Sequence, residues 1–162
     1  DEGIDPAGKR VLVLGAGGAA KAAALALAQA GCRVTVCART PEKAAALAAR
    51  CGGVTVSWED LPRAAAEHGL LLNATPLGME GSPEFESLDF VQALPTKAVV
   101  YDLVYHPTDT ALLRAAGSRE LTAVGGLALL VQQAALAFAY FTGIVPDAAL
   151  CRDILQELEA AQ

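Results

Sequence analysis

Three small residues at fixed spacing follow a short apolar run near the start of the chain. Residues 11–14 are apolar, and Gly15-x-Gly17-x-x-Ala20 leads from them into an alanine-rich segment. This order predicts a strand, a tight turn and a helix, in which the second glycine lets a phosphate approach the backbone. The unpaired amides and positive dipole of the helix N-terminus favour an anion. The pattern therefore predicts a dinucleotide site, with an ordinary packing turn as the alternative.

A second cluster indicates which dinucleotide would bind. Where NAD sites carry a carboxylate for the ribose hydroxyls, at the end of the second strand, this chain has Arg39, followed by Thr40 and Lys43. A guanidinium pairs with a 2′-phosphate through two charge-assisted bonds, whereas a carboxylate would repel it. The cluster favours NADP(H) over NAD and S-adenosylmethionine. The alternative is that Arg39 and Lys43 are solvated surface charges.

Short apolar runs alternate with helical segments along the whole chain. We expect strands at 9–14, 33–37, 54–57, 70–73, 98–103 and 121–124, and helices at 18–30, 41–50, 59–67, 110–116, 126–142 and 146–160. Thr40 is expected to cap the second helix, whose first residue is Pro41. Apolar strands separated by helices predict an α/β fold: a Rossmann-like, doubly wound, mostly parallel sheet of about six strands with helices on both faces. We divide the chain into a dinucleotide-binding domain, 1–125, and C-terminal helices, 126–162, that form one continuous unit with it.

The candidate ligand residues all fall just past the ends of predicted strands. Gly15, Arg39, Thr75, Tyr105 and Gly126 each occupy such a position, and residues 74–87 form a long loop of the kind that often binds ligands. Because open α/β sheets bind ligands at the carboxyl ends of their strands, we expect these residues to share one site.

Composition and charge exclude several function classes. The net charge is −6 and the 12 Lys and Arg residues are scattered, which argues against a nucleic-acid partner. The four cysteines and two histidines show no metal-ligand spacing, so we expect reduced, mostly structural thiols and no metal. No signal peptide or membrane span is predicted, and the expected location is the cytoplasm. The chain begins at Asp1 rather than Met, which is typical of a processed chain or a piece of a longer one.

Five motifs in order resemble the NADP-binding domain of the shikimate dehydrogenase family, and the resemblance covers nearly the whole chain. They are Gly15-Ala16-Gly17-Gly18-Ala19-Ala20-Lys21-Ala22, Arg39-Thr40-Pro41-Glu42-Lys43-Ala44, Asn73-Ala74-Thr75-Pro76-Leu77-Gly78-Met79, Tyr101-Asp102-Leu103-Val104-Tyr105-His106-Pro107 and Gly126-Leu127-Ala128-Leu129-Leu130-Val131-Gln132-Gln133. The resemblance implies reversible NADPH-dependent reduction of 3-dehydroshikimate to shikimate, in the pathway to aromatic amino acids.

The resemblance also implies a set of binding residues. Those implied for NADP are Gly15, Ala16, Gly17, Gly18, Ala19, Arg39, Thr40, Lys43, Asn73, Thr75, Leu103, Gly126 and Leu129, and those implied for the substrate are Tyr105 and Gln133. Each has a structural alternative: Tyr105 as a packing aromatic, Gln133 as a solvated helix residue and Asn73 as a turn former. Three positions depart from the family pattern, with Ala38 for Asn, Pro76 for Ser and Leu129 for Met.

The family's N-terminal substrate domain, which carries the catalytic Lys and Asp, has no counterpart in these residues. Lys21 and Lys97 do not replace it, since one lies on the cofactor helix and the other before a strand. We therefore expect the cofactor half of a two-domain dehydrogenase, which binds NADP(H) without turnover and has no catalytic residue of its own. The alternatives are a stand-alone NADP-binding sensor or scaffold and a quinate-type dehydrogenase. Apolar residues of the last two helices resemble the segment that packs on the substrate domain, so self-association is expected.

Overall fold

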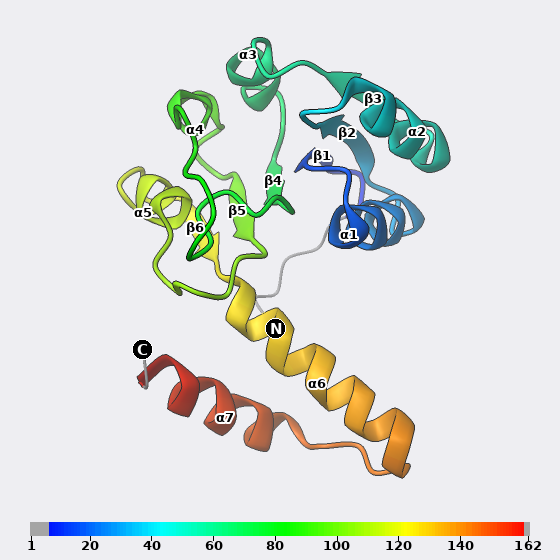
Figure 1. Ribbon diagram of the computed structural model, residues 1–162, viewed down its shortest axis with the longest axis vertical. Helices are drawn as coiled ribbons and strands as arrows, with labels where there is room; N and C mark the ends of the chain where they lie inside the picture. Colours follow the sequence, from blue (N-terminus) through cyan, green and yellow to red (C-terminus); the bar gives the residue numbers. More distant parts are fainter. Residues whose placement is uncertain (1–6, 161–162) are drawn as a thin grey trace.

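A six-stranded parallel sheet forms the centre of the computed structural model, which describes residues 7–160 (Figure 1). The strand order is β3-β2-β1-β4-β5-β6, and every pair of neighbours is parallel. The strands are β1 (Arg10–Leu14), β2 (Arg33–Cys37), β3 (Val54–Val56), β4 (Leu70–Asn73), β5 (Val99–Asp102) and β6 (Thr122–Val124). The order reverses between β1 and β4, so the crevice of this doubly wound sheet lies beside the glycine turn that follows β1. The predicted fold class is confirmed.

Helices cover both faces because successive side chains of the strands point to opposite sides. They are α1 (Gly18–Gln29), α2 (Pro41–Cys51), α3 (Leu61–Ala65), α4 (Asp89–Ala93), α5 (Ala111–Gly117), α6 (Gly126–Thr142) and α7 (Ala148–Ala160). Val11 and Val13 belong to the core under α1 and α2, whereas Leu12 and Leu14 belong to the core under α3, α4 and α5. All four are fully buried. The central strand β1 is therefore buried on both faces, whereas the edge strands β3 and β6 are largely exposed.

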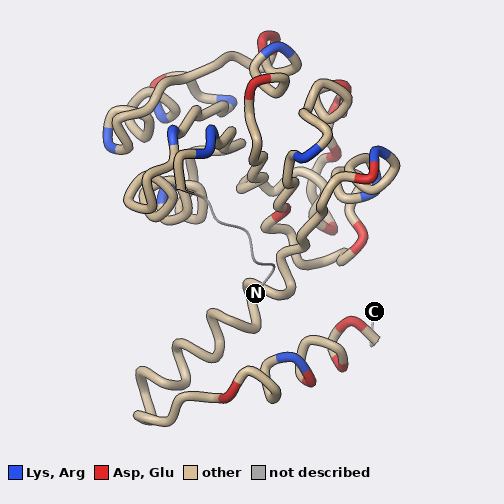
Figure 2. Tube along the Cα trace, turned by 180° about the vertical axis from the view of Figure 1, so that it is seen from behind, with Lys and Arg blue, Asp and Glu red and all other residues tan. Residues whose placement is uncertain are grey.

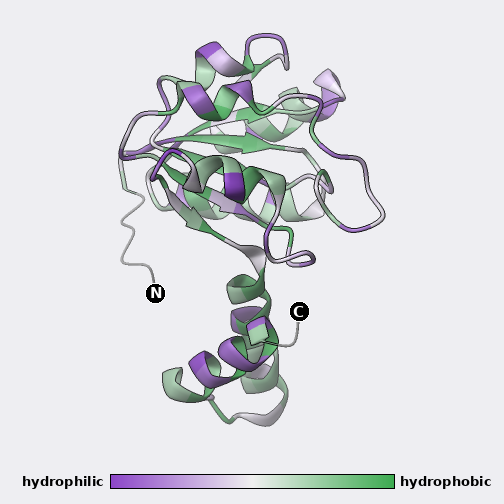
Figure 3. Ribbon diagram, turned by 90° about the vertical axis from the view of Figure 1, so that its left-hand side faces the viewer, coloured by the Kyte–Doolittle hydropathy of each residue, from purple (hydrophilic) through white to green (hydrophobic). Residues whose placement is uncertain are grey.

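Helices α6 and α7 extend away from the sheet as a separate pair (Figures 1 and 3). Only Gly126, Leu127 and Val131 of α6 are buried, and Figure 2 shows no charged residue along that helix. Phe141, Tyr140 and Val145 are each more than four-fifths exposed. Among residues 7–160, no helix is long and apolar enough to span a membrane. Residues 1–6 and 161–162, at the outer ends of the two predicted units, lie outside the described residues.

Several expected elements differ in detail. The helix expected at 59–67 is shorter, Leu61–Ala65, and helix α4 was not expected. Helix α4 has only five residues, too few to show a helical repeat; it is held by burial of Phe90 and Val91 and by Arg119, which donates to the Val91 and Leu94 carbonyls.

Thr40 occupies the N-cap position of α2, as predicted, and its backbone there is extended. Its side chain makes no capping hydrogen bond, although its backbone oxygen accepts from the amides of Lys43 and Ala44, each at 3.1 Å. Pro41 at the first helical position already has the φ angle of a helix and brings no amide that needs a partner.

Candidate functional site

The carboxyl ends of β2, β1, β4 and β5 are joined into one edge by backbone hydrogen bonds. These run from Gly15 N to Cys37 O (2.7 Å), Ala74 N to Leu14 O (2.9 Å), Leu103 N to Asn73 O (2.9 Å) and Gly126 N to Val104 O (3.1 Å). The structure thus brings the glycine turn, the 74–87 loop, the loop after β5 and the start of α6 to the same edge. The loop after β2, with Arg39, begins there as well.

The glycines of the turn after β1 are of two kinds. Gly15 has φ +108°, and a Cβ there would lie 2.7 Å from the Ala74 carbonyl oxygen, so the packing of the chain itself requires glycine. Gly17 and Gly18 have ordinary φ angles, and a Cβ on either would meet no protein atom within 4 Å. Both are exposed at the N-terminus of α1, next to Ala19, while Ala16 is buried. No contact among residues 7–160 explains the missing side chains at Gly17 and Gly18, whereas a phosphate seated on the helix amides would.

Two cations stand at the N-terminus of α2. Arg39 and Lys43 are exposed, and within residues 7–160 neither forms an ion pair with a carboxylate. Glu42 lies in the same first turn of α2. The hydroxyl of Thr40, half-buried beside them, makes no capping hydrogen bond. An arginine, a lysine and a hydroxyl at a helix N-terminus are donors suited to a phosphate monoester.

A buried polar network ties β4 to β5 and α5. Asn73 and Asp102 are neighbours in the strand register and are both fully buried. The Asn73 amide donates to Asp102 Oδ1 at 2.8 Å, and its carbonyl oxygen accepts from the Thr75 amide at 3.0 Å and from the Thr75 hydroxyl. The Asn73 side chain is thus occupied within the fold and shapes the loop that begins at Thr75, which is itself partly exposed.

Asp102 and Thr110 complete this network, and the sequence analysis did not identify Thr110. Asp102 Oδ1 also accepts from the Val104 amide at 3.1 Å, and Oδ2 accepts from the Thr110 hydroxyl at 2.7 Å. Thr110 in turn caps α5 by accepting from the Leu113 amide. Burial raises the pKa of Asp102, while its three hydrogen bonds lower it. Asn73 and Asp102 each stand at the end of an apolar run in the sequence, but no sequence pattern links Thr110 to them.

Cys37, the last residue of β2, is poorly suited to act as a nucleophile. It is fully buried, and burial, reinforced by Glu59, raises its pKa to about 12. The thiolate is therefore not populated at neutral pH. Within residues 7–160, no group of three or more His, Cys, Asp or Glu side chains could hold a metal ion.

The start of α6 packs directly on the loop after β5. A Cβ on Gly126 would lie 2.6 Å from the Leu103 carbonyl carbon and 2.7 Å from the Val104 oxygen, so only glycine allows this approach. Leu103 and Leu129 are both half-buried near this junction. Tyr105, two residues past Leu103, is 47% exposed. Gln133 is exposed on α6, seven residues and therefore about 10 Å along the helix from Gly126.

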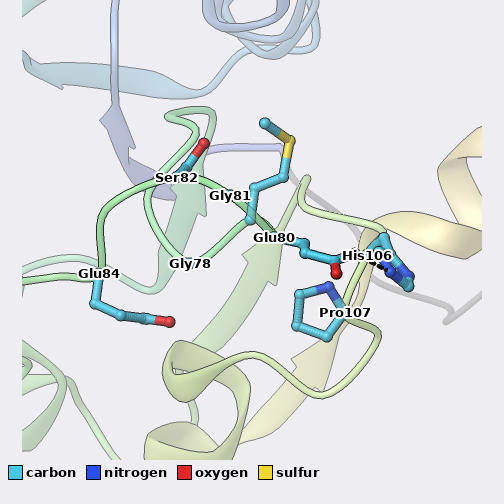
Figure 4. Close-up of a pocket in the computed structure, with 8 residues that line it drawn as sticks. Gly78, Glu80, Gly81, Ser82, Glu84, His106 and Pro107 are labelled. Carbon is cyan, nitrogen blue, oxygen red and sulfur yellow. Dashed lines mark ion pairs between the residues drawn. The ribbon is translucent and has the colours of Figure 1, made fainter.

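A shallow pocket opens between the 74–87 loop and the loop after β5, where His106 and Pro107 line it (Figure 4). Glu80 and His106 form an ion pair across it at 2.5 Å, and the Glu80 amide donates to the His106 carbonyl at 3.1 Å. Val104, on the other side of Tyr105, is buried and hydrogen-bonded through both its amide and its carbonyl. The residues on both sides of Tyr105 are therefore held in place.

Two family models match the sequence. One, described as shikimate / quinate 5-dehydrogenase, matches residues 3–79, and the other, the shikimate 5′-dehydrogenase C-terminal domain, matches residues 126–156. A shikimate dehydrogenase (NADP(+)) from Acidiphilium cryptum is 48% identical over 158 residues, which is 96% of this chain and 56% of that protein. The shikimate dehydrogenase (NADP(+)) of Symbiobacterium thermophilum is 44% identical over 153 residues, 88% of this chain and 52% of its own. The chain spans about half the length of the curated relatives that it matches.

Solved structures agree with this similarity. The shikimate 5-dehydrogenase of Thermus thermophilus, solved in complex with NADP(H) and shikimate, has a TM-score of 0.80 at 40% identity. The match covers 96% of this chain and 57% of that one. The quinate dehydrogenase of Corynebacterium glutamicum, solved in complex with NAD, has a TM-score of 0.81 at 31% identity and covers 92% of this chain and 55% of its own.

Proposed function

Because the chain belongs to the shikimate dehydrogenase family, we propose that its residues form the NADP(H)-binding half of an enzyme that reversibly reduces 3-dehydroshikimate to shikimate. The observation that carries this proposal is the pair of exposed cations just past β2, Arg39 and Lys43, which have no carboxylate partner among residues 7–160. The open space above Gly17 and Gly18 fits a diphosphate, and the cations fit a 2′-phosphate.

Each part of the edge has a distinct role in this proposal. The turn from Gly15 to Ala19 binds the diphosphate through backbone amides, and Arg39, Thr40 and Lys43 bind the 2′-phosphate. Asn73 shapes the loop that presents Thr75 to the cofactor. Leu103, Gly126 and Leu129 form the surface against which the nicotinamide lies. When bound, NADP(H) supplies or accepts the hydride.

Tyr105 and Gln133 orient the substrate by hydrogen bonding on the open side of this surface. Tyr105 is suited to the role because its neighbours are fixed, which lowers the entropy cost of placing its hydroxyl. A pure NADP sensor has no use for such groups, so their presence favours the enzyme half over the sensor.

The proton that accompanies the hydride comes from outside these 162 residues. At the edge, Asp102 is buried and accepts three hydrogen bonds, and the thiol of Cys37 holds its proton at neutral pH. Lys97 precedes β5, at the opposite end of the sheet. We therefore expect no shikimate-dependent reduction of NADP⁺ by the purified 162-residue chain, and measurable turnover would overturn this part of the proposal.

The binding proposal is tested by calorimetric titration with NADP⁺ and NAD⁺. We expect a preference for NADP⁺ that Arg39→Ala reduces about 10- to 100-fold, as loss of a charge-assisted pair predicts. Arg33→Ala is the matched control, because Arg33 is an exposed arginine at the other end of the same strand. Preference for NAD⁺ would instead favour a quinate-type dehydrogenase, and failure to bind either would refute the site.

The exposed apolar residues at the C-terminal end of α6 and in the segment that links it to α7 are the surface that we propose contacts the substrate domain. Leu136, Tyr140, Phe141, Ile144 and Val145 are 62% to 86% exposed in this chain. Exposed patches of this kind drive association, so the 162-residue chain is expected to self-associate through them.

A further inference from the structure

Helix α1 carries one charged residue, Lys21, which is not among the residues proposed to contact the cofactor or the substrate. The other eleven residues of the helix are Ala, Leu, Gly and Gln. Lys21 is exposed, and within residues 7–160 it forms no ion pair. The single charge of this helix therefore lies in its first turn, at its fourth residue, and needs a physical explanation.

Its position is unfavourable for the helix by itself. Lys21 lies at the N-terminal end of α1, where the dipole is positive and a cation costs stability. Exposed positions further along, at Ala22, Ala26 and Gln29, would accept a solvating lysine away from that end. Solubility alone therefore does not explain a lysine at position 21. An anion bound at the N-terminus of α1 would make the electrostatic interaction of Lys21 at that end favourable.

The geometry places Lys21 directly above the glycine turn. Its amide donates to the Gly17 carbonyl at 3.0 Å, so it lies one helical turn beyond Gly17. Helical side chains lean toward the N-terminus of their helix, and a lysine ammonium reaches about 6 Å from its Cα, which spans roughly one turn. A Cβ on Gly17 or Gly18 would meet no atom of residues 7–160 within 4 Å, so room for an anion remains beside the turn that precedes Lys21.

We propose that Lys21 binds the diphosphate of the dinucleotide and so adds a side-chain cation to the backbone amides of the glycine turn. This inference rests on the proposed function and deepens it. It separates two anion sites: Arg39 and Lys43 bind the 2′-phosphate, whereas Lys21 binds the bridging diphosphate. The two sites should then respond independently to ligands that carry only one of the two groups.

The test measures binding of NADP⁺, NAD⁺ and adenosine 2′-monophosphate to the chain and to Lys21→Gln. The last ligand has the 2′-phosphate and no diphosphate. We expect Lys21→Gln to weaken NADP⁺ and NAD⁺ by the same factor, about three- to tenfold for an exposed, charge-assisted contact, and to leave adenosine 2′-monophosphate unchanged. Lys21→Arg should retain affinity for all three.

Lys97→Gln is the matched control, since Lys97 is exposed and precedes β5 at the opposite end of the sheet. Unchanged NADP⁺ affinity in Lys21→Gln, with Arg39→Ala still impaired, would overturn this inference and leave the proposed function standing. Equal weakening of all three ligands would also overturn it, because that result indicates a general charge effect. Failure of the unaltered chain to bind NADP⁺ would refute the proposed function, and this inference with it.

Discussion

Replacing Asp102 with alanine removes the acceptor at the centre of the network that joins β4, β5 and α5. Three donors lose their partner at once: the Asn73 amide, the Val104 amide and the Thr110 hydroxyl. Asp102 has no exposed surface, so these donors have no ready access to water. Each buried donor left unsatisfied costs about 1–3 kcal/mol, so we expect Asp102→Ala to lower the free energy of unfolding by at least about 3 kcal/mol.

Asp102→Asn is the matched variant. Its amide oxygen can still accept from Asn73 and Val104, while the Thr110 hydroxyl loses its acceptor, so the expected cost is about 1 kcal/mol. The asparagine also removes a titration. Burial raises the pKa of Asp102 above its ordinary value of 3.8, so between the two values the folded state holds more protons than the unfolded state. The stability contributed by this group is therefore present below pH 3.8 and lost as the pH rises through the folded-state pKa.

The assay is urea unfolding followed by circular dichroism and by fluorescence of Trp58, the one tryptophan of the sequence. The difference in unfolding free energy between the unaltered chain and Asp102→Asn should shrink as the pH rises above 3.8. Asp102→Ala within about 1 kcal/mol of the unaltered chain would show that water satisfies the three donors. A difference between the chain and Asp102→Asn that does not change with pH would refute the argument from burial.

Three further predictions concern a buried histidine, two glycines of the turn after β1 and two exposed aromatic residues of α6. His68 is 2% exposed, and burial lowers its pKa below 6.5. The free energy of unfolding should therefore fall as the pH drops below 6.5, by up to about 1.4 kcal/mol per pH unit. Thermal unfolding of His68→Gln should lack this pH dependence, and the same pH dependence in the variant would contradict the attribution to His68. Gly15→Ala should lower the free energy of unfolding by about 1–3 kcal/mol, because the residue has a positive φ. Gly17→Ala should lower it by less than about 1 kcal/mol, and yet weaken NADP⁺ binding at least about tenfold. Tandem Tyr140→Asp and Phe141→Asp should lower the apparent mass of the chain in light scattering at high concentration, and a monomeric unaltered chain would refute self-association.

The succession of strands and helices along the chain, and the parallel character of the sheet, could be predicted because parallel strands buried on both faces leave a strong apolar pattern. The expected β2 at 33–37 and β4 at 70–73 match the structure, and β5 is one residue shorter at each end than expected. Helix α4 could not be predicted, since five residues carry no periodicity and its position depends on Arg119, which is 25 residues further along the chain than Leu94. Thr40 stands at the predicted N-cap position, with Pro41 as the first helical residue, but its hydroxyl makes no capping hydrogen bond.

The candidate site, like the fold, could be predicted from the sequence only in part. Positions just past strand ends could be placed at one edge, because all parallel strands present their carboxyl ends together. The link between Asn73 and Asp102 depends on the strand register, and the link to Thr110 depends on the path of a loop, and neither is visible in a single sequence. Asn73 illustrates the consequence, because its side chain is wholly used within the fold and its part in the site is to shape the loop.

At one edge of the sheet, the packing of the chain explains the identity of some residues and does not explain the identity of others. Gly15 and Gly126 are explained by close backbone neighbours, and Asp102 by its donors. Gly17 lacks any such neighbour, and Lys21 opposes the dipole of its own helix. Arg39, two residues past the end of β2, has no carboxylate partner among residues 7–160. Packing accounts for the first group, and a ligand with two separated phosphate groups accounts for the second, since an anion would turn each unfavourable or unused feature into a favourable contact.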